Sequence, residues 1–126
     1  MSGNKVIIDT NIAIYFLLGH KEVDQYFYHF TPIFSFISEL ELLSGRDFYP
    51  NELEEIKRFL SKQTIWGYSP ALKEIVIEIR QKKKLKLPDA IIAATAVYFD
   101  IPLATTDKSF KNIDGLTVLY NEFPTL

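Results

Sequence analysis

The sequence predicts an α/β domain in which a mostly parallel β-sheet is flanked by helices. Short apolar runs such as residues 5–9 (KVIID) have no polar face, as expected of strands buried in a parallel sheet. Longer segments between them carry apolar residues at helical spacing. The order βααβααβααβ, with one further strand at the end, is typical of a sheet built from helical crossovers. We expect residues 1–126 to form a single domain of this class, because a chain of that length can bury one core.

The composition narrows the class of protein. Hydrophobic residues make up 48% and charged residues 24%, as in an ordinary globular protein, and no apolar run approaches the roughly 20 residues of a membrane span. The absence of cysteine excludes disulfides and thiolate zinc sites. We expect no signal peptide, because residues 1–9 (MSGNKVIID) lead directly into a strand-like run. We therefore expect a cytoplasmic protein. The net charge of −2 argues against a surface that binds nucleic acid everywhere but permits a local basic track.

The first half of the chain contains the signals of two strands and three helices. Gly19 suits the left-handed residue that follows a helix, so we expect it to end the first helix. Pro32 is expected to open the second strand. Ser38 and Glu41 have the spacing of a capping box, with Gly45 at the end of that helix. The expected elements are a strand over 5–9, helices over 10–19 and 21–30, a strand over 33–37 and a short helix over 38–45.

The second half is predicted to add three helices and three strands. An amphipathic helix is indicated by apolar residues at i, i+3, i+4 and i+7, namely Leu72, Ile75, Val76 and Ile79. The next helix begins at Pro88, is apolar around nearly its whole circumference, and contains alanines that permit close approach to a sheet. The expected elements are helices over 51–63, 70–84 and 88–99 and strands over 64–69, 101–105 and 116–120.

Four acidic residues lie close to the ends of expected strands or to the starts of expected helices. Asp9 and Asp107 close strands, Glu41 lies one turn into a helix after the second strand, and Asp89 lies in the first turn of the buried helix. Each has a local explanation: a helix cap for Asp9, a capping box for Glu41, a helix-dipole complement for Asp89 and a turn for Asp107. These explanations do not predict that all four meet at the sheet edge where open α/β sheets bind ligands.

Four carboxylates at one edge indicate a cation site. Two carboxylates about 4 Å apart repel by roughly 4 kcal/mol at an effective dielectric constant near 20. Their pKa values rise unless a cation lies between them. Oxygen ligands without histidine or cysteine favour Mg²⁺ or Mn²⁺, ions that activate a bound water and polarise a phosphoryl oxygen. The two histidines, His20 and His29, have no metal-ligand spacing and are interpreted as structural or surface residues.

Four motifs occur in the order and with the residue types of the PIN domain. They are VIIDTNIAI, SELELLSG, LPDAIIAATA and LATTDKSF, and together they span residues 6–110. The sequence resembles more narrowly the VapC-like toxin ribonucleases of type II toxin–antitoxin pairs. This resemblance implies an α/β/α sandwich with a central mostly parallel sheet. It also implies a Mg²⁺- or Mn²⁺-dependent endoribonuclease.

The resemblance assigns roles to individual residues. The glutamate position of the family falls on Glu41 rather than Glu39, because only Glu41 has Gly45 four residues later. The last acid is the most variable in the family, which accepts Asn or Asp there. The implied catalytic and metal-binding residues are Asp9, Glu41, Asp89 and Asp107, and the supporting polar residues are Asn11, Ser38 and Thr105. Asp9, Glu41 and Asp89 would hold the principal ion, and Asp107 would complete the site or hold a second ion.

The resemblance also implies a reaction and partners. A metal-bound water would attack the phosphorus of an RNA strand and leave 5′-phosphate and 3′-hydroxyl ends. The toxin class implies a homodimer and a small antitoxin protein that covers the acidic pocket. The aromatic residues 26–30 (YFYHF) suggest a surface for such a partner, although aromatic residues at this spacing are also typical of a core.

A basic run lies just before Asp89 and comprises Arg80, Lys82, Lys83, Lys84 and Lys86. It could bind the phosphates of an RNA backbone, which would make binding sensitive to salt. It could equally be a solvated face whose cations complement a helix C-terminus. The sequence supports both interpretations.

Other classes of protein explain the acids less completely. A non-toxin PIN-like nuclease would share the same motifs. A catalytically inert PIN scaffold that binds RNA or protein predicts the loss of one or more acids, and all four are present. A response-regulator receiver needs adjacent acids after the first strand, and a haloacid dehalogenase needs Asp-x-Asp where this chain has Asp9-Thr10-Asn11.

Overall fold

The fold is built on a five-stranded sheet. The computed structural model describes residues 4–45 and 50–122. The strands have the spatial order β3-β2-β1-β4-β5, and all four pairings between neighbours are parallel. The predicted parallel sheet is therefore confirmed. The strands are β1 (Lys5–Ile8), β2 (Thr31–Ser35), β3 (Thr64–Trp66), β4 (Leu103–Thr105) and β5 (Val118–Tyr120).

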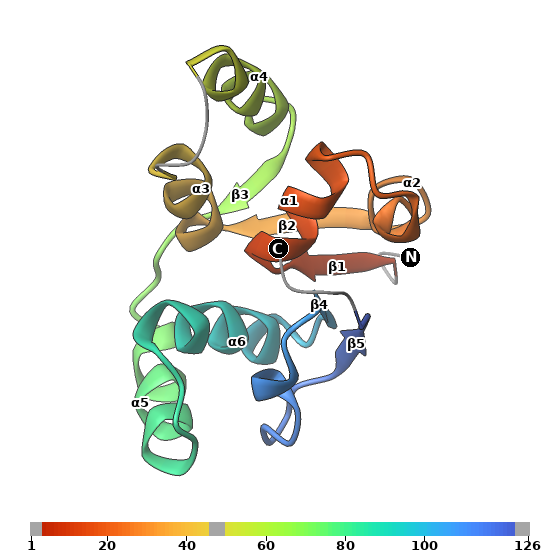
Figure 1. Ribbon diagram of the computed structural model, residues 1–126. Coiled ribbons are helices and arrows are strands. Elements are labelled where there is room, and N and C mark those ends of the chain that lie inside the picture. The colour runs from red at the N-terminus through yellow and green to blue at the C-terminus, as the bar shows by residue number, and fades with distance from the viewer. Residues whose placement is uncertain (1–3, 46–49, 123–126) are drawn as a thin grey trace.

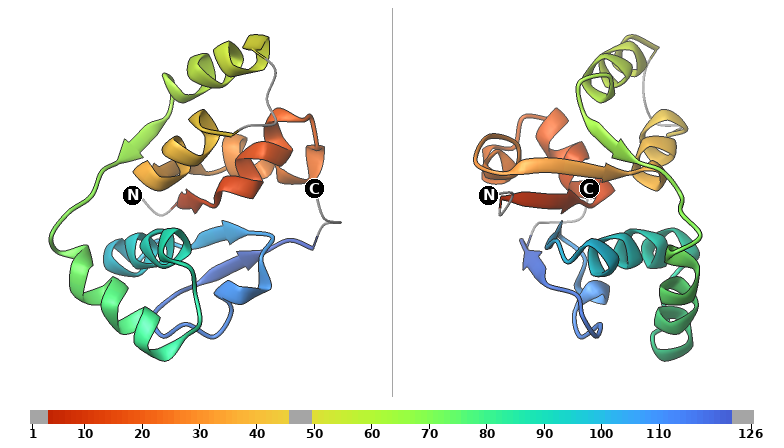
Figure 2. Two further views of the ribbon diagram at one scale, coloured as in Figure 1. Left: turned by 60° about the vertical axis from the view of Figure 1, so that its left-hand side comes forward. Right: turned by 180° about the vertical axis from the view of Figure 1, so that it is seen from behind.

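Helices cover both faces of the sheet, which makes the molecule an α/β/α sandwich (Figure 1). The helices from the first half of the chain lie on one side, and α5 and α6 lie on the other, as the two views in Figure 2 also show. The helices are α1 (Thr10–Leu17), α2 (Gln25–Tyr28), α3 (Phe36–Leu43), α4 (Pro50–Leu60), α5 (Leu72–Lys82) and α6 (Leu87–Phe99), with 3₁₀ helices η1 (Lys21–Val23) and η2 (Lys108–Phe110). No helix in the described part of the chain is long and apolar enough to cross a membrane.

Alternation along the central strand divides the core into two layers. Val6 and Ile8 of β1 pack with α1, α2, α3 and α4, whereas Ile7 packs with α5 and α6. All three side chains have no exposed surface. This is why the strand is apolar at every position: each face of the parallel sheet is covered by a helical layer.

Helix α6 is the buried helix that the sequence predicts. Ala90, Ala93, Ala94 and Ala96 are buried, so small side chains line the contacts of this helix with the sheet and with α5. Pro88 lies in the first turn, where its missing N–H costs nothing. The same turn carries Asp89, and burial of the following residues anchors it beside the sheet.

The boundary between β2 and α3 differs from the prediction. β2 already includes Thr31 and Pro32, and α3 begins at Phe36 rather than at Ser38. Pro32 is tolerated because it pairs only with β1; pairing of β2 with β3 begins at Ile33. Ser35 is the N-cap, since its hydroxyl accepts a hydrogen bond from Ile37 N–H at 3.1 Å. The predicted capping box of Ser38 and Glu41 is therefore wrong, and both residues are available for other contacts.

The predicted helix over 21–30 is also wrong in extent. It is replaced by η1 and the four-residue α2. Of the aromatic cluster at residues 26–30, Tyr26 is buried, Phe27 and Phe30 are half-buried, and Tyr28 and His29 are exposed. Tyr26, Phe27 and Phe30 therefore contribute to the core, and Tyr28 and His29 remain on the surface. Gly19 does adopt a left-handed φ of 87° after α1, as predicted.

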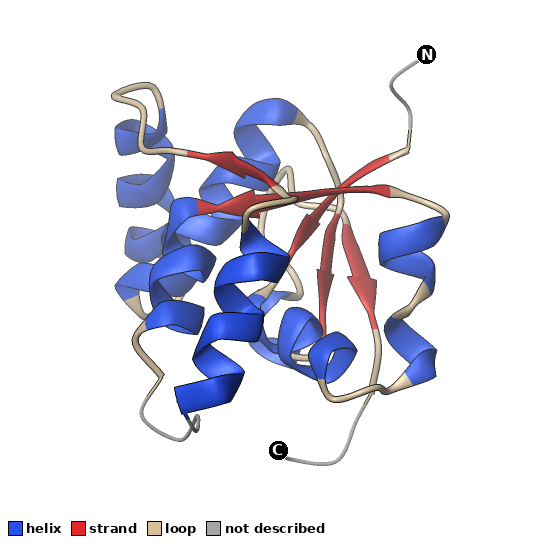
Figure 3. Cartoon of the chain, turned by 90° about the horizontal axis from the view of Figure 1, so that it is seen from above, coloured by secondary structure: helices blue, strands red, loops and turns tan. Residues whose placement is uncertain are grey.

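The strand order places a binding edge between β1 and β4. From β1 the chain proceeds outward to β2 and β3 and then crosses to β4 and β5 on the other side. Figure 3 looks down on the twisted sheet and shows the strands fanning out between the helical layers. Ligands of open parallel sheets bind outside the carboxyl ends of the strands at such a reversal. Asp9 directly follows β1, and Asp107 follows β4.

Candidate active site

The four predicted acids meet in one hollow at the carboxyl edge of the sheet. They come from four separate segments: the ends of β1 and β4, helix α3, and the first turn of α6. Their convergence follows from the crossovers and not from proximity in sequence. The lining residues are Asp9, Thr10, Asn11, Ile14, Glu41, Lys86, Pro88, Asp89 and Asp107.

Asp9 is the most firmly held of the four acids. Its Oδ1 accepts a hydrogen bond from the backbone N–H of Thr10 at 2.8 Å, and its Oδ2 accepts one from the Thr105 hydroxyl at 2.7 Å. Its own backbone N–H donates to the carbonyl of Ala104 on the neighbouring strand. Only 6% of Asp9 is exposed. The predicted helix cap is present, and the same carboxylate faces the hollow.

Thr105 links the ends of the two central strands. Its buried hydroxyl donates to Asp9 and accepts a hydrogen bond from the backbone N–H of Asp107 at 3.0 Å. Asp107 caps η2, because its Oδ1 accepts the N–H of Ser109 at 2.8 Å. One hydroxyl thus fixes the carboxylate of Asp9 relative to the backbone that carries Asp107.

Glu41 reaches the hollow from the second turn of α3. Its Oε1 lies 2.6 Å from the hydroxyl oxygen of Thr10, which in turn lies 2.9 Å from the hydroxyl oxygen of Ser38. The sequence predicted Ser38 as a supporting residue but missed Thr10. The available signal was its position next to Asp9 in the Asp-Thr-Asn motif, which places it at the start of α1.

The pKa values of Asp9 and Asp89 are raised, so the charged form of each carboxyl group is disfavoured in the hollow. Burial raises the pKa of Asp9 from 3.8 to about 6; the hydrogen bond from Thr105 opposes the rise, and the nearby charges of Asp89 and Asp107 add to it. Burial also raises the pKa of Asp89, with further contributions from Asp107 and Glu41, while Lys86 lowers it. Repulsion between the acids is therefore a real component of the site.

The donor set suits a small hard cation. The hollow is lined by carboxylate, hydroxyl and amide groups, without histidine or cysteine among its lining residues. In residues 4–45 and 50–122, no group of three or more histidine, cysteine or acidic side chains is already arranged closely enough to hold a metal ion. Carboxylates without a cation between them repel one another, so an open arrangement is expected.

The remaining predicted residues divide into two groups. Ser38 and Thr105 are buried beneath the acids, and exposed Asn11 lines the hollow. Of the basic run, Lys86 lines the acidic hollow, and an adjacent groove beside α5 is lined by Arg80, Lys83 and Lys84. The ammonium of Lys82 lies 3.7 Å from Glu78 and 3.6 Å from Asp114. The run is therefore not one continuous track into the site.

Comparisons with known proteins agree with this fold. The family model of the PIN domain matches residues 6–116. A chain of a toxin–antitoxin complex from Klebsiella pneumoniae is 33% identical over 94% of this chain and 99% of that chain, with a TM-score of 0.81. A comparison with curated proteins found no match.

More distant solved structures share the fold. A chain of the DNA-bound VapBC from Salmonella typhimurium has a TM-score of 0.82 at 21% identity, covering 92% of this chain and 97% of that chain. A chain of VapBC2 from Rickettsia felis, bound to a DNA fragment from its promoter, has a TM-score of 0.78 at 23% identity, covering 94% and 99%.

A three-layer parallel α/β fold with carboxylates at its switch point is the architecture of a PIN-type nuclease. The chain belongs to the PIN-domain family.

Proposed function

We propose that the protein is a Mg²⁺- or Mn²⁺-dependent endoribonuclease and the toxin of a toxin–antitoxin pair. One observation carries the proposal: acids from four separate segments, Asp9, Glu41, Asp89 and Asp107, line one hollow at the switch point of the sheet. Individual capping roles explain some of these acids but not their convergence. Raised pKa values of Asp9 and Asp89 support a site in which a cation offsets the repulsion.

The residues of the site would have different roles. Asp9, Glu41 and Asp89 would hold the principal ion, and Asp107 would complete the site or hold a second one. When bound, the ion supplies an activated water and a Lewis acid for hydrolysis of a phosphodiester, which leaves a 5′-phosphate and a 3′-hydroxyl. Thr105 holds the carboxylate of Asp9 in one orientation, while Asn11 offers a polar group at the rim.

The substrate would approach past Lys86. Its ammonium lowers the pKa of Asp89, so it acts on the acids, and it lies at the hollow where a phosphate would enter. Arg80, Lys83 and Lys84 line the groove next to it and would bind phosphates farther along the strand. Lys82 pairs with Glu78 and Asp114, and the ammonium of Lys83 donates to the carbonyl of Lys111 at 3.1 Å.

Cleavage of RNA tests this proposal. The purified protein is expected to cut RNA with Mn²⁺ or Mg²⁺, and EDTA is expected to stop the reaction. Asp9→Asn or Asp89→Asn should abolish cleavage, because each removes a charged oxygen ligand. Glu39→Gln is the matched control for Glu41→Gln: both residues lie on α3, but Glu39 does not line the hollow. Cleavage that persists in EDTA would refute the metal mechanism.

RNA binding measured at several salt concentrations tests the basic residues. Lys86→Ala should weaken RNA binding more than Lys82→Ala, and it should also reduce the dependence of binding on salt. Equal effects of the two substitutions would remove Lys86 from the substrate path.

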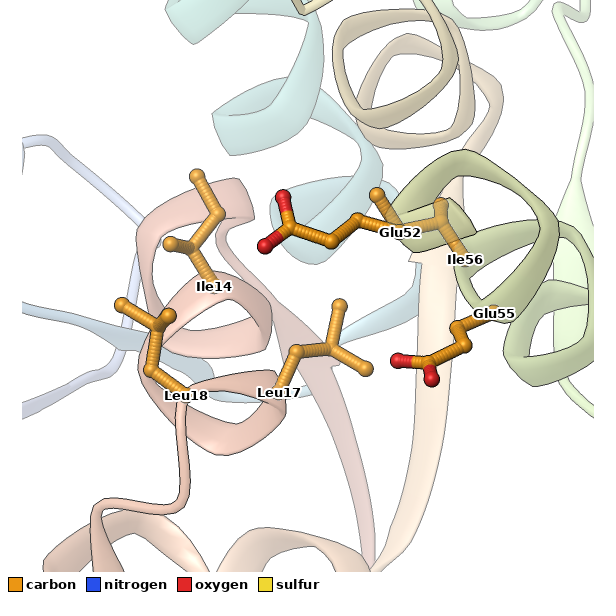
Figure 4. A pocket seen from close by; sticks show the side chains of 6 residues that line it. All are labelled: Ile14, Leu17, Leu18, Glu52, Glu55 and Ile56. Carbon is orange, nitrogen blue, oxygen red and sulfur yellow. The ribbon is translucent and has the colours of Figure 1, made fainter. Parts of the chain in front are cut away.

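An apolar groove supports the antitoxin partner. It lies between α1 and α4 and is lined by Ile14, Leu17, Leu18, Glu52, Glu55 and Ile56 (Figure 4). Leu17 and Leu18 are 37% and 64% exposed. Ile14 also lines the acidic hollow, so the groove and the hollow lie next to each other. A segment with apolar side chains and a basic residue would fill the groove and reach the acids.

The toxin assignment further implies a homodimer, which light scattering on the purified chain would test. The alternatives are a non-toxin PIN nuclease and an inert PIN scaffold that binds RNA or protein. A short adjacent reading frame whose product binds and inhibits this protein would favour the toxin. Complete absence of cleavage with either ion would favour the scaffold.

A further inference from the structure

We infer that Thr10 is a positioning residue that fixes the carboxylate of Glu41 at the acidic hollow, with Ser38 orienting Thr10. The inference rests on the proposed function, because it assigns Glu41 to the metal-binding set. Thr10 lies at the junction of β1 and α1, whereas Glu41 and Ser38 belong to α3. The contact therefore joins two elements that carry different acids of the site.

Proton accounting gives the direction of the hydrogen bonds. Thr10 Oγ1 lies 2.6 Å from Oε1 of Glu41 and 2.9 Å from Oγ of Ser38. An ionised carboxylate only accepts, and a hydroxyl has one proton to donate. Thr10 must therefore donate to Glu41, which leaves its oxygen free to accept the proton of Ser38. Ser38 has no exposed surface, so water does not compete for this hydrogen bond.

Glu41 needs such a contact more than the other acids. Asp9 and Asp107 each accept a backbone N–H, and Asp89 is a short side chain in the first turn of a buried helix. Glu41 is exposed on α3 and has one more rotatable bond than an aspartate. Without the Thr10 hydroxyl its carboxylate would sample several rotamers, and binding an ion would have to restrict them.

The backbone of Thr10 adds a second link. Its N–H donates to Oδ1 of Asp9 at 2.8 Å, while its hydroxyl donates to Glu41. One residue thus contacts two acids from different segments and sets their relative position. Contacts of this kind, one step removed from an ion, commonly change metal affinity by about tenfold to a hundredfold.

Thr10→Val is the direct test, because valine preserves the shape of the side chain and the backbone N–H but removes the hydroxyl. Mn²⁺ binding to the RNA-free protein is measured by titration calorimetry. We expect Thr10→Val to weaken Mn²⁺ binding about tenfold, Thr10→Ser to restore most of it, and Ser38→Ala to produce a smaller loss. Unfolding in EDTA reports whether each variant is folded.

The same substitution made in a Glu41→Gln variant separates a positioning role of Thr10 from a general structural effect. If Thr10 acts through Glu41, Thr10→Val should weaken Mn²⁺ binding much less in a Glu41→Gln protein than in the wild type. Equal Mn²⁺ affinity of wild type and Thr10→Val would overturn the inference. So would an equal loss in both backgrounds. Failure of the wild type to bind Mn²⁺ would instead overturn the proposed function.

Discussion

At the scale of single residues, Asp9 links the stability of the protein to pH. In the folded protein its pKa is raised from 3.8 to about 6, because the carboxylate is buried and faces other acids. Between these two values the unfolded chain has released its proton and the folded chain has kept it. The contribution of Asp9 to stability is therefore complete below pH 3.8 and is lost as the pH rises through 6.

The metal-free protein should accordingly become less stable as the pH rises from 5 to 7.5. The pKa shift corresponds to about 3 kcal/mol in all, of which about half falls in this interval. Urea unfolding in EDTA at both pH values measures it. Asp9→Asn removes the titration, so its stability should vary less with pH. A variant with the same pH dependence as the wild type would show that Asp9 has an ordinary pKa.

The acids and two of the hydroxyl residues beside them, Ser38 and Thr105, could be predicted from the sequence, but the link through Thr10 could not. Each acid lies next to a recognisable strand end or helix start, and the parallel topology brings these positions together. Thr10 carries no such signal, because threonine at a helix start has an adequate local role of its own. Its partner Ser38 was assigned to a cap that Ser35 provides instead. Only the packing of α1 against α3 reveals their contact.

At the scale of elements, the groove between α1 and α4 is where the proposed antitoxin would bind. Leu18 follows the last residue of α1 and is 64% exposed, so replacing it costs the fold little. Leu18→Asp should weaken binding of the antitoxin by at least tenfold, because it places a charge in an apolar contact beside Glu52 and Glu55. Metal-dependent RNA cleavage should persist, since Leu18 does not line the acidic hollow.

Ile77→Asp is the matched control for the groove. Ile77 is a 41% exposed aliphatic residue on α5, in the opposite helical layer. Binding is measured by co-purification without RNA, with the product of the adjacent reading frame as the probe, because Ile77 also lines the groove that is proposed to bind the RNA backbone. If Ile77→Asp weakened binding and Leu18→Asp did not, the partner would occupy the α5 side of the molecule instead.

Element order was predictable, whereas element boundaries depended on packing. Periodicity alone distinguishes strands from helices, but two serines three residues apart, Ser35 and Ser38, could each begin α3. Pairing of Ser35 with Trp66 extends β2 to Ser35, so the helix starts directly after it. The segment 21–30 is divided into η1, which ends at Val23, and α2, which ends at Tyr28, and no feature of the sequence marks this division.

At the scale of the whole molecule, the site is a property of the complete fold. Its acids span the chain from Asp9 to Asp107, and α6 carries Asp89 in from the opposite helical layer. An ion held by all of these segments exists only while the fold exists. Binding the folded state and not the unfolded chain stabilises a protein by mass action, by about 2.7 kcal/mol at a ligand concentration 100 times Kd.

Mn²⁺ should therefore raise the melting temperature of the wild type by about 10 °C at that concentration. Asp89→Asn should gain far less. In EDTA, however, the variant should melt no lower than the wild type, because it loses a carboxylate whose pKa is raised by burial and by Asp107 and Glu41. A variant that is much less stable in EDTA would show that Asp89 serves chiefly to stabilise the start of α6. Glu39→Gln, which leaves the hollow intact, should respond to Mn²⁺ as the wild type does.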